Sequence, residues 1–102
     1  MWNIDEAIIF IRQYQQSFRQ FNYHIGLIGS VLNDGISIKD LDIVVLPMSN
    51  GKEANIKLLI PFLEEHFAAA KIIDKEYEFD GRILMKSFIN DKRIDWFIYT
   101  QE

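Results

Sequence analysis

Hydrophobic residues recur at helical spacing in two segments of the chain. The first segment opens with Asn3 and Glu6, whose spacing is typical of a capping box, and it ends near Asn22. Its apolar positions fall mainly on one helical face: Ile4, Ala7, Ile8, Ile11, Phe18 and Phe21. The second segment covers residues 53–67, where Pro61 either bends the helix or begins a new first turn. The pattern predicts two amphipathic helices.

Five further segments have the composition and length of β-strands: residues 23–28, 41–46, 71–79, 82–89 and 93–100. The run from Leu41 to Leu46 is continuously apolar, which predicts a strand buried on both faces. Asp80-Gly81 predicts a hairpin between the third and fourth strands, and a second turn is expected at residues 90–92. We therefore expect an α+β fold with helices packed on a mixed sheet of about five strands, forming a single domain over residues 1–102.

A glycine-serine pair ends the first strand, and two acids interrupt the start of the second. Nine residues separate Ser30 from Asp40. Gly29 lets the backbone approach a ligand, and Ser30 offers a hydroxyl and an N–H group where a short helix is expected over residues 31–34. Because the start of a helix favours anions, this turn is suited to phosphate.

Asp40 and Asp42 require a partner, because aspartate is depleted in strands and is rarely buried alone. Residues two apart on a strand share a face and lie roughly 6.5 Å apart, so both carboxylates could flank a divalent cation while Leu41 faces the core. Mg²⁺ prefers such hard oxygen ligands. The alternative is a strand-entry turn with one ion pair to Arg82 or Lys86.

The same residues resemble the core motif of minimal nucleotidyltransferases of the DNA polymerase beta superfamily. That motif is a hydrophobic residue, Gly, and Gly or Ser, then roughly nine to thirteen residues, then acid-hydrophobic-acid-hydrophobic. Ile28-Gly29-Ser30 and Asp40-Leu41-Asp42-Ile43 match it. The family also uses a third carboxylate on a later strand, for which Asp95 is the candidate. The resemblance covers His24 to Tyr99 and implies the nucleotidyltransferase fold.

The resemblance further implies a transferase that moves a nucleoside monophosphate from an NTP, most simply ATP, to an acceptor hydroxyl with release of pyrophosphate. Gly29 and Ser30 would hold the β and γ phosphates. Asp40 and Asp42 would bind two Mg²⁺ or Mn²⁺ ions together with the NTP. Asp95 would help to hold the catalytic ion and to deprotonate the acceptor.

Two other residues are candidates for contacts with the nucleotide. Lys39 precedes the acidic pair and could lean toward a triphosphate, the alternative being a solvated lysine. Strand alternation places Asp95, Phe97 and Tyr99 on one face, so Tyr99 is the expected neighbour of the base.

The strand that holds Asp95 can pair beside the strand that holds Asp40. Three carboxylates would then lie within roughly 5 to 7 Å of one another. Their repulsion should raise at least one pKa, and a divalent ion should stabilise the fold by relieving it. A structural ion pair is the alternative role for Asp95.

Composition limits the partners and the compartment. The net charge is −4 and no basic run exceeds Lys92-Arg93, which argues against nucleic acid and favours a protein or small-molecule acceptor. The chain has no cysteine, which excludes disulfides and thiolate metal sites and favours a reducing compartment. Charged residues interrupt the N-terminal 21 residues and no apolar run reaches about 18, so we expect no signal peptide, no membrane span and a cytoplasmic protein.

The acceptor half of the reaction has no evident place in the sequence, because the chain stops shortly after Asp95. We therefore expect a second chain to supply it, either a homodimer partner or a separate helical partner resembling HEPN-type toxins. Many relatives carry a polar residue after the Gly-Ser pair, where this chain has Val31. The alternative function is a catalytically weak, antitoxin-like or regulatory interaction module that keeps the fold.

Overall fold

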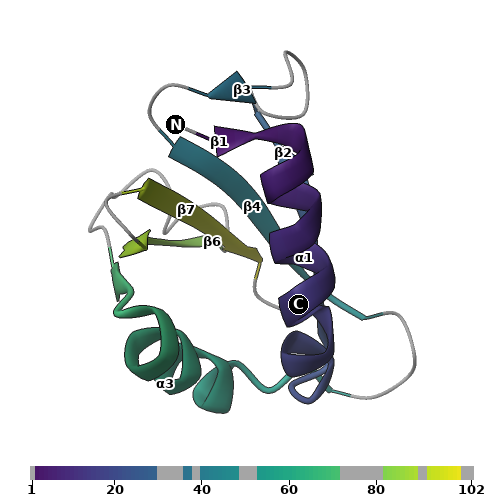
Figure 1. Cartoon of the computed structure of the whole chain (residues 1–102). Coiled ribbons are helices and arrows are strands. Elements are labelled where there is room, and N and C mark those ends of the chain that lie inside the picture. The colour runs from purple at the N-terminus through teal and green to yellow at the C-terminus, as the bar shows by residue number, and fades with distance from the viewer. Residues whose placement is uncertain are drawn as a thin grey trace.

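The computed structural model describes residues 2–29, 36–37, 40–48, 53–71, 82–89 and 92–99, with backbone only for residues 36–37. Its elements follow in the order β1 (Trp2–Asn3), α1 (Ile4–Arg19), β2 (Tyr23–Ile28), β3 (Ile36–Ser37), β4 (Asp40–Pro47), α3 (Ile56–Phe67), β5 (Ala70–Lys71), β6 (Arg82–Ile89) and β7 (Lys92–Tyr99) (Figure 1). Neither described helix is long and apolar enough to cross a membrane.

The main sheet has five strands in the order β2-β4-β7-β6-β5. Its two central strands, β4 and β7, run parallel, and the other neighbours are antiparallel. The expected mixed sheet and α+β fold are therefore confirmed. A second sheet of β1 and β3 was not expected, because two-residue strands leave no periodic signal in the sequence.

Asparagine side chains fix the starts of both helices. The Oδ1 atom of Asn3 accepts a hydrogen bond of 2.9 Å from the Glu6 amide, so the expected N-terminus of α1 is confirmed. Residue 53 was the expected start of the second helix, but α3 begins at Ile56, because the side chain of Asn55 caps it through the Leu58 amide. Pro61 lies inside α3 and does not interrupt it.

The first helix ends three residues before the expected Asn22. The amides of Phe21 and Asn22 donate to the carbonyls of Phe18 and Arg19, which closes a tight turn after the helix. Asn22 adopts a φ of 62°, a left-handed conformation that asparagine tolerates better than most residues.

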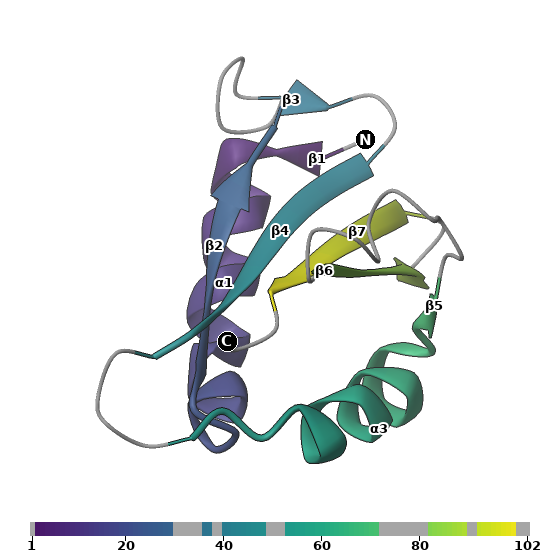
Figure 2. The same ribbon diagram turned by 180° about the vertical axis from the view of Figure 1, so that it is seen from behind.

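The core lies between one face of the sheet and the two helices. Trp96 is fully buried at its centre, with ring centroids of Phe10 and Phe18 on α1 at 6.0 and 5.6 Å and that of Phe67 on α3 at 5.0 Å. Both helices therefore cover the same face of the sheet, and Figure 2 shows α1 lying behind β2 and β4. The indole N–H donates to the Ser87 hydroxyl at 2.7 Å, so this buried polar group has a partner.

The expectation that β4 is buried on both faces was wrong. Leu41, Ile43 and Val45 are fully buried, whereas Val44 is half-buried and Leu46 is 37% exposed. The reason is that both helices pack on the face of Trp96, which lies beside Ile43 in the register of β4 and β7. The apolar run thus concealed an alternating strand whose other face carries the two acids.

Several expected elements lie wholly or partly outside the described residues. These are the short helix at residues 31–34, the hairpin at residues 80–81 and the turn at residues 90–91. Of the strand expected over residues 71–79, the described part is Lys71, which forms β5 with Ala70.

Candidate metal centre

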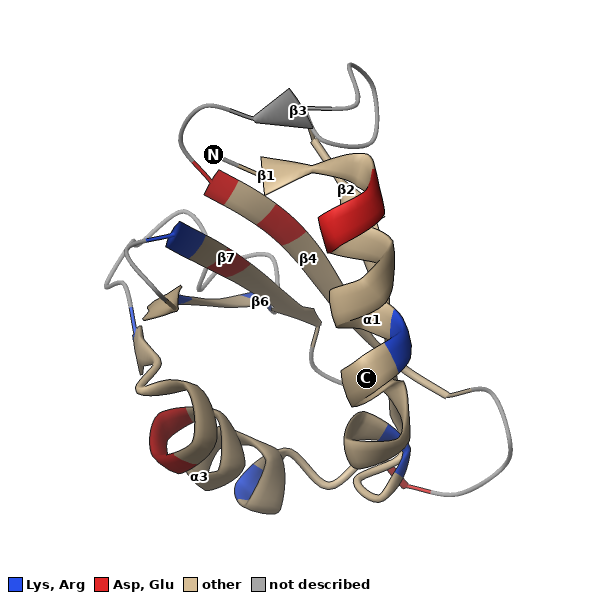
Figure 3. Cartoon of the chain, in the orientation of Figure 1, with Lys and Arg blue, Asp and Glu red and all other residues tan. Residues whose placement is uncertain are grey.

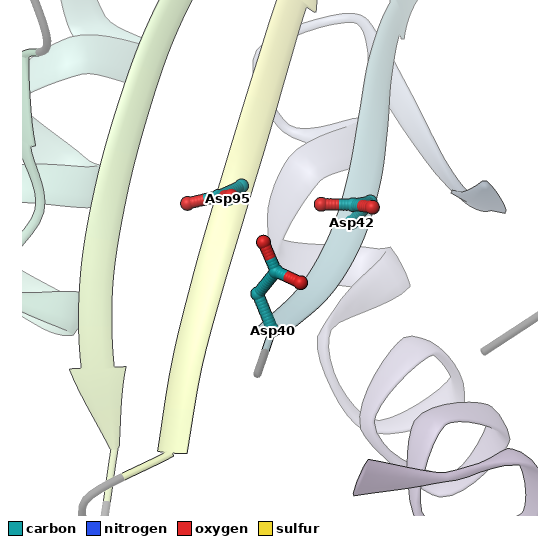
Figure 4. A group of neighbouring side chains, drawn as sticks. All are labelled: Asp40, Asp42 and Asp95. Atoms are coloured by element: carbon teal, nitrogen blue, oxygen red, sulfur yellow. The ribbon is translucent and has the colours of Figure 1, made fainter. Parts of the chain in front are cut away.

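The register of two parallel strands brings three carboxylates together. Asp42 on β4 is the direct Cα partner of Asp95 on β7, and Asp40 lies two residues before Asp42 on the same strand. One oxygen from each carboxylate lies within 4.8 Å of the other two, slightly closer than the sequence predicted. Figure 4 shows the three side chains gathered on these neighbouring strands.

Strand alternation explains why the three acids share one face. Leu41 and Ile43 point into the core, so Asp40 and Asp42 point away from it. On β7 the buried neighbours Ile94 and Trp96 place Asp95 on that same outer face. The acidic positions of β4 and β7 lie side by side, with the basic start of β7 next to them (Figure 3).

The environment of Asp42 favours its protonated form. Burial raises the pKa of Asp42 to about 6, and the negative charges of Asp40 and Asp95 act in the same direction, whereas Arg93 opposes them. Mutual repulsion was expected to raise at least one carboxyl pKa; the direction agrees for Asp42, but burial is the main cause and repulsion adds to it. Asp42 therefore loses its proton as pH rises through about 6, and above that pH its carboxylate is available to a cation.

Asp95 is 7% exposed and also has a raised pKa. Burial is the main cause, a hydrogen-bonded contact with the Asp40 carboxyl adds to it, and Arg93 lowers it. The Arg93 Nε atom donates to Asp95 Oδ1 at 2.8 Å. A metal ion bound between these carboxylates would relieve the repulsion that contributes to the raised pKa of Asp95.

The sequence interpretation missed Arg93. An ion pair of Asp40 or Asp42 with Arg82 or Lys86 was the alternative to a metal site, whereas in the structure Arg93 forms an ion pair with Asp95. The signal was present, because Arg93 lies two residues before Asp95 on the same strand and therefore on the same face.

Gly29 lies against the acidic cluster immediately after β2. Its φ is +79°, and a Cβ atom at this position would overlap Asp42 Oδ2 and lie 3.1 Å from Asp42 Cγ. Only glycine permits both this backbone conformation and this approach. The glycine of the motif therefore fixes how closely the turn approaches the acids.

Three further residues were predicted to contact the nucleotide, and the structure describes one of them, Tyr99. Ser30 and Lys39 lie outside the described residues. Tyr99 is on the outer face of β7, four residues from Asp95, which is about 13 Å along an extended strand. Its ring faces the Arg82 guanidinium at 5.7 Å, and Arg82 Nη1 donates to its hydroxyl at 3.4 Å. Its contact with a base stays a prediction.

The cluster has the chemistry of a divalent metal site. Oxygens that share one Mg²⁺ lie at most about 4.2 Å apart, since each bond is about 2.1 Å, and paired ions lie about 4 Å apart. A separation of at most 4.8 Å among the three ligand atoms suits one ion or a bridged pair after small side-chain movements. The donor set is hard oxygen throughout, which favours Mg²⁺ or Mn²⁺.

Comparison with known proteins identifies the fold. No family model and no curated protein matches the sequence. Among solved structures, a cytoplasmic RNA terminal U-transferase superposes with a TM-score of 0.59 at 14% identity, over 93% of this chain and 28% of the other. The polymerase core of TRAMP, an RNA surveillance complex, superposes with a TM-score of 0.52 at 16% identity, over 92% of this chain and 35% of the other.

This chain therefore spans about a third of the length of these two structures or less. At such low identity the likeness concerns the fold, which is that of nucleotidyltransferase catalytic cores. The minimal subtype expected from the sequence stays a prediction.

Proposed function

We propose that this chain, which has the nucleotidyltransferase fold, transfers a nucleoside monophosphate from an NTP to an acceptor hydroxyl. The observation that carries the proposal is the cluster of Asp40, Asp42 and Asp95 on the outer face of two parallel strands. A nucleotidyltransferase fold without activity has no need for three converging acids, two of which are energetically strained by burial and mutual repulsion.

The proposed reaction is an in-line displacement at the α phosphorus of the NTP. A bond forms between the acceptor oxygen and the α phosphorus, while the bond from that phosphorus to the bridging oxygen breaks and pyrophosphate leaves. Asp95 helps to accept the acceptor's proton, which then passes to solvent. Bound Mg²⁺ or Mn²⁺ would neutralise the charge of the triphosphate and lower the pKa of the acceptor hydroxyl.

The three acids have distinct places in this scheme. Asp40 and Asp42 come from one strand and would together hold two ions, whereas Asp95 comes from the neighbouring strand and would bind the ion nearest the acceptor. Gly29 brings the turn after β2 against Asp42, where the β and γ phosphates would lie. Ser30 and Lys39 as phosphate contacts, Tyr99 as a base contact and ATP as the donor belong to the proposal.

The test is transfer of label from α-³²P-labelled NTPs in Mg²⁺ or Mn²⁺, with an oligonucleotide, a protein lysate and a small-molecule fraction offered separately as acceptors. Asp42→Asn and Asp95→Asn should each abolish transfer. Glu65→Gln, an exposed acid on α3, should retain it. Transfer that survives Asp42→Asn would overturn the proposed chemistry.

Calorimetry separates the enzyme from the alternative of an interaction module. An enzyme should bind NTP in a metal-dependent manner that Asp42→Asn abolishes. A module that acts only by contact would show no heat of NTP binding and would keep its partner affinity in the same variant.

A further inference from the structure

The outer face of the sheet forms a continuous row across four strands at the level of Asp95. Ile28 on β2 pairs with Asp42, Asp42 with Asp95, and Asp95 with Lys86 on β6. Direct cross-strand partners project from the same face of a sheet. Lys86 therefore lies next to Asp95 on its β6 side. Asp42 lies on the opposite side of Asp95, and Gly29, the residue after Ile28, lies beyond it on the β2 side.

A second row lies beside the first. Asp40 on β4 pairs with Arg93 on β7, and Arg93 pairs with Phe88 on β6. Met85 and Ser87 are buried on the inner face, so the intervening Lys86 and the next residue, Phe88, project outward. Phe88 is 59% exposed, a large apolar surface beside the acidic cluster. Lys86 and Phe88 on β6, together with the adjacent Arg93 on β7, are called the β6 surface below.

The β6 surface keeps cationic groups that are available to a ligand. Lys86 is exposed and forms no ion pair with another described residue. Arg93 uses its Nε atom for Asp95, its side chain is 40% exposed, and its Nη atoms make no hydrogen bond to another described residue. Those Nη atoms are the part of a guanidinium that grips a phosphate.

The geometry of in-line displacement assigns the β6 surface to the acceptor. This assignment rests on the proposed function. The attacking oxygen and the leaving pyrophosphate lie on opposite sides of the α phosphorus. If the triphosphate lies against Gly29 beside Asp42, the acceptor must approach from the Asp95 side. Lys86 and Phe88 on β6 lie on that side of Asp95, and Arg93 lies beside Phe88 on β7, two residues before Asp95.

We propose that the β6 surface binds the 3′-terminal nucleotide of a single-stranded nucleic acid as the acceptor. An exposed aromatic ring next to two cations matches a planar base next to phosphates, and single-stranded nucleic acids are bound in this way. The base stacks on Phe88, and the adjoining phosphates lie against Lys86 and the Arg93 Nη atoms. The ring of a protein tyrosine could also stack on Phe88, but a tyrosine carries no phosphate to engage the cations.

The proposal reverses the expectation drawn from the net charge. That charge of −4 is a sum over the whole chain, whereas an acceptor meets the local field of the surface it touches. On the β6 side of Asp95, Lys86 adds a positive charge next to Phe88, and the Arg93 guanidinium beside Phe88 is shared with Asp95.

The test is the anisotropy of fluorescein-labelled single-stranded octamers, one of RNA and one of DNA, titrated with the full chain in Mg²⁺. Phe88→Ser should weaken binding about tenfold through loss of stacking. Lys86→Gln should weaken it about threefold at low salt and reduce the salt slope by about one. A difference between the two octamers assigns the acceptor to RNA or DNA.

Matched controls come from two adjacent exposed residues on α3. Lys57→Gln and Leu58→Ser make the same chemical changes away from the cluster, and Leu58 is 56% exposed, much like Phe88. Both should bind the octamers within twofold of the wild type. Thermal unfolding of all four variants verifies that each one folds.

The outcomes separate this inference from the proposed function. Octamer binding that is equal in Phe88→Ser, Lys86→Gln and the controls overturns the inference, even where NTP still binds in an Asp42-dependent manner. The inference is also overturned if the transfer assay labels a protein and not the octamer, and if Lys86→Gln leaves that labelling unchanged. Failure of metal-dependent NTP binding counts against the proposed function itself, whichever way the octamers behave.

Discussion

At the scale of single residues, the contact between Gly29 and Asp42 couples the backbone of one strand to the chemistry of another. The glycine has no Cβ, so the turn after β2 closes directly onto the carboxylate. Asp42 in turn is surrounded by burial and by two further acids, which raise its pKa to about 6. The Gly29 backbone conformation and the raised pKa of Asp42 are both features that the proposed metal-bound NTP would exploit.

The first prediction concerns Gly29→Ala. The new methyl group would overlap Asp42 Oδ2 in a left-handed backbone conformation, so Asp42 must move. We expect a loss of about 1 to 2 kcal/mol of stability and at least about a tenfold loss of metal-dependent NTP affinity, measured by denaturant unfolding and calorimetry. Gly26→Ala is the control, because its Cβ would lie an ordinary 3.5 Å from Val44 Cγ1. Unchanged NTP affinity in Gly29→Ala would remove this glycine from the site.

The second prediction concerns pH. The folded pKa of Asp42, about 6, exceeds its ordinary value of 3.8, so the folded protein holds a proton that the unfolded chain releases between these values. The contribution of Asp42 to stability is therefore greatest at low pH and is lost as pH rises through about 6. The raised pKa of Asp95 acts in the same direction.

Asp42→Asn should flatten this pH dependence in the presence of a chelator. Because Asp42 is only half-buried, we expect a gain of about 1 kcal/mol in the free energy of unfolding at pH 7.5. Urea unfolding from pH 4.5 to 8 measures it, with Glu65→Gln as the control. If the free energy of unfolding instead rises between pH 5 and 7, and by the same amount in the wild type and in Asp42→Asn, the raised pKa of Asp42 is contradicted.

At the scale of elements, the short strand β1 contacts both β7, which carries Asp95, and β3, which precedes the acidic strand β4. Trp2 pairs with Ser37 on β3, which lies shortly before Asp40 in the chain. The Nε1 atom of Trp2 donates a hydrogen bond of 3.0 Å to the Arg93 carbonyl on β7. Lys92 lies over the Trp2 ring at 4.9 Å and forms an ion pair with Glu6 on α1. The N-terminal segment thus fixes the start of β7 relative to α1.

The third prediction concerns Trp2→Phe, which keeps an aromatic ring but removes the N–H group. The Arg93 carbonyl loses a partly buried partner, so we expect about 1 kcal/mol of destabilisation and a several-fold weaker affinity for Mn²⁺. Asn3→Ala is the matched control, since loss of the α1 cap costs about 1 kcal/mol without touching β7. If the two variants bind Mn²⁺ equally well, β1 has no effect on the metal centre beyond general stability.

At the scale of the whole molecule, metal binding and folding should be linked. The unfolded chain does not hold the three carboxylates together, so the proposed cation would bind the folded state selectively. We expect Mn²⁺ or Mg²⁺ with ATP to raise the melting temperature by several degrees, measured by differential scanning fluorimetry, and to lose that effect in Asp95→Asn. An unchanged melting temperature in saturating metal, with and without nucleotide, would argue against the site.

The predictability of the fold differed between its parts for physical reasons. The cap of α1 and the bounds of β2 and β6 followed from local signals that the structure left unchanged. The ion pair between Arg93 and Asp95 was not predicted, because the spacing shows that the two residues share a face but not which charged neighbour each side chain contacts. The pairing of β1 with β3 joins segments more than thirty residues apart, and two-residue strands carry no period from which to infer it.

The sequence by itself determined which residues are the candidate acids and glycine, and the alternation that puts Asp40 and Asp42 on one face, because these depend on residue type and local spacing. The tertiary structure alone decided which side of β4 the helices cover and that Asp42 lies opposite Asp95. It also placed Lys86 and Phe88 beyond Asp95. Register and layer order arise from contacts between distant segments, which short-range patterns do not encode.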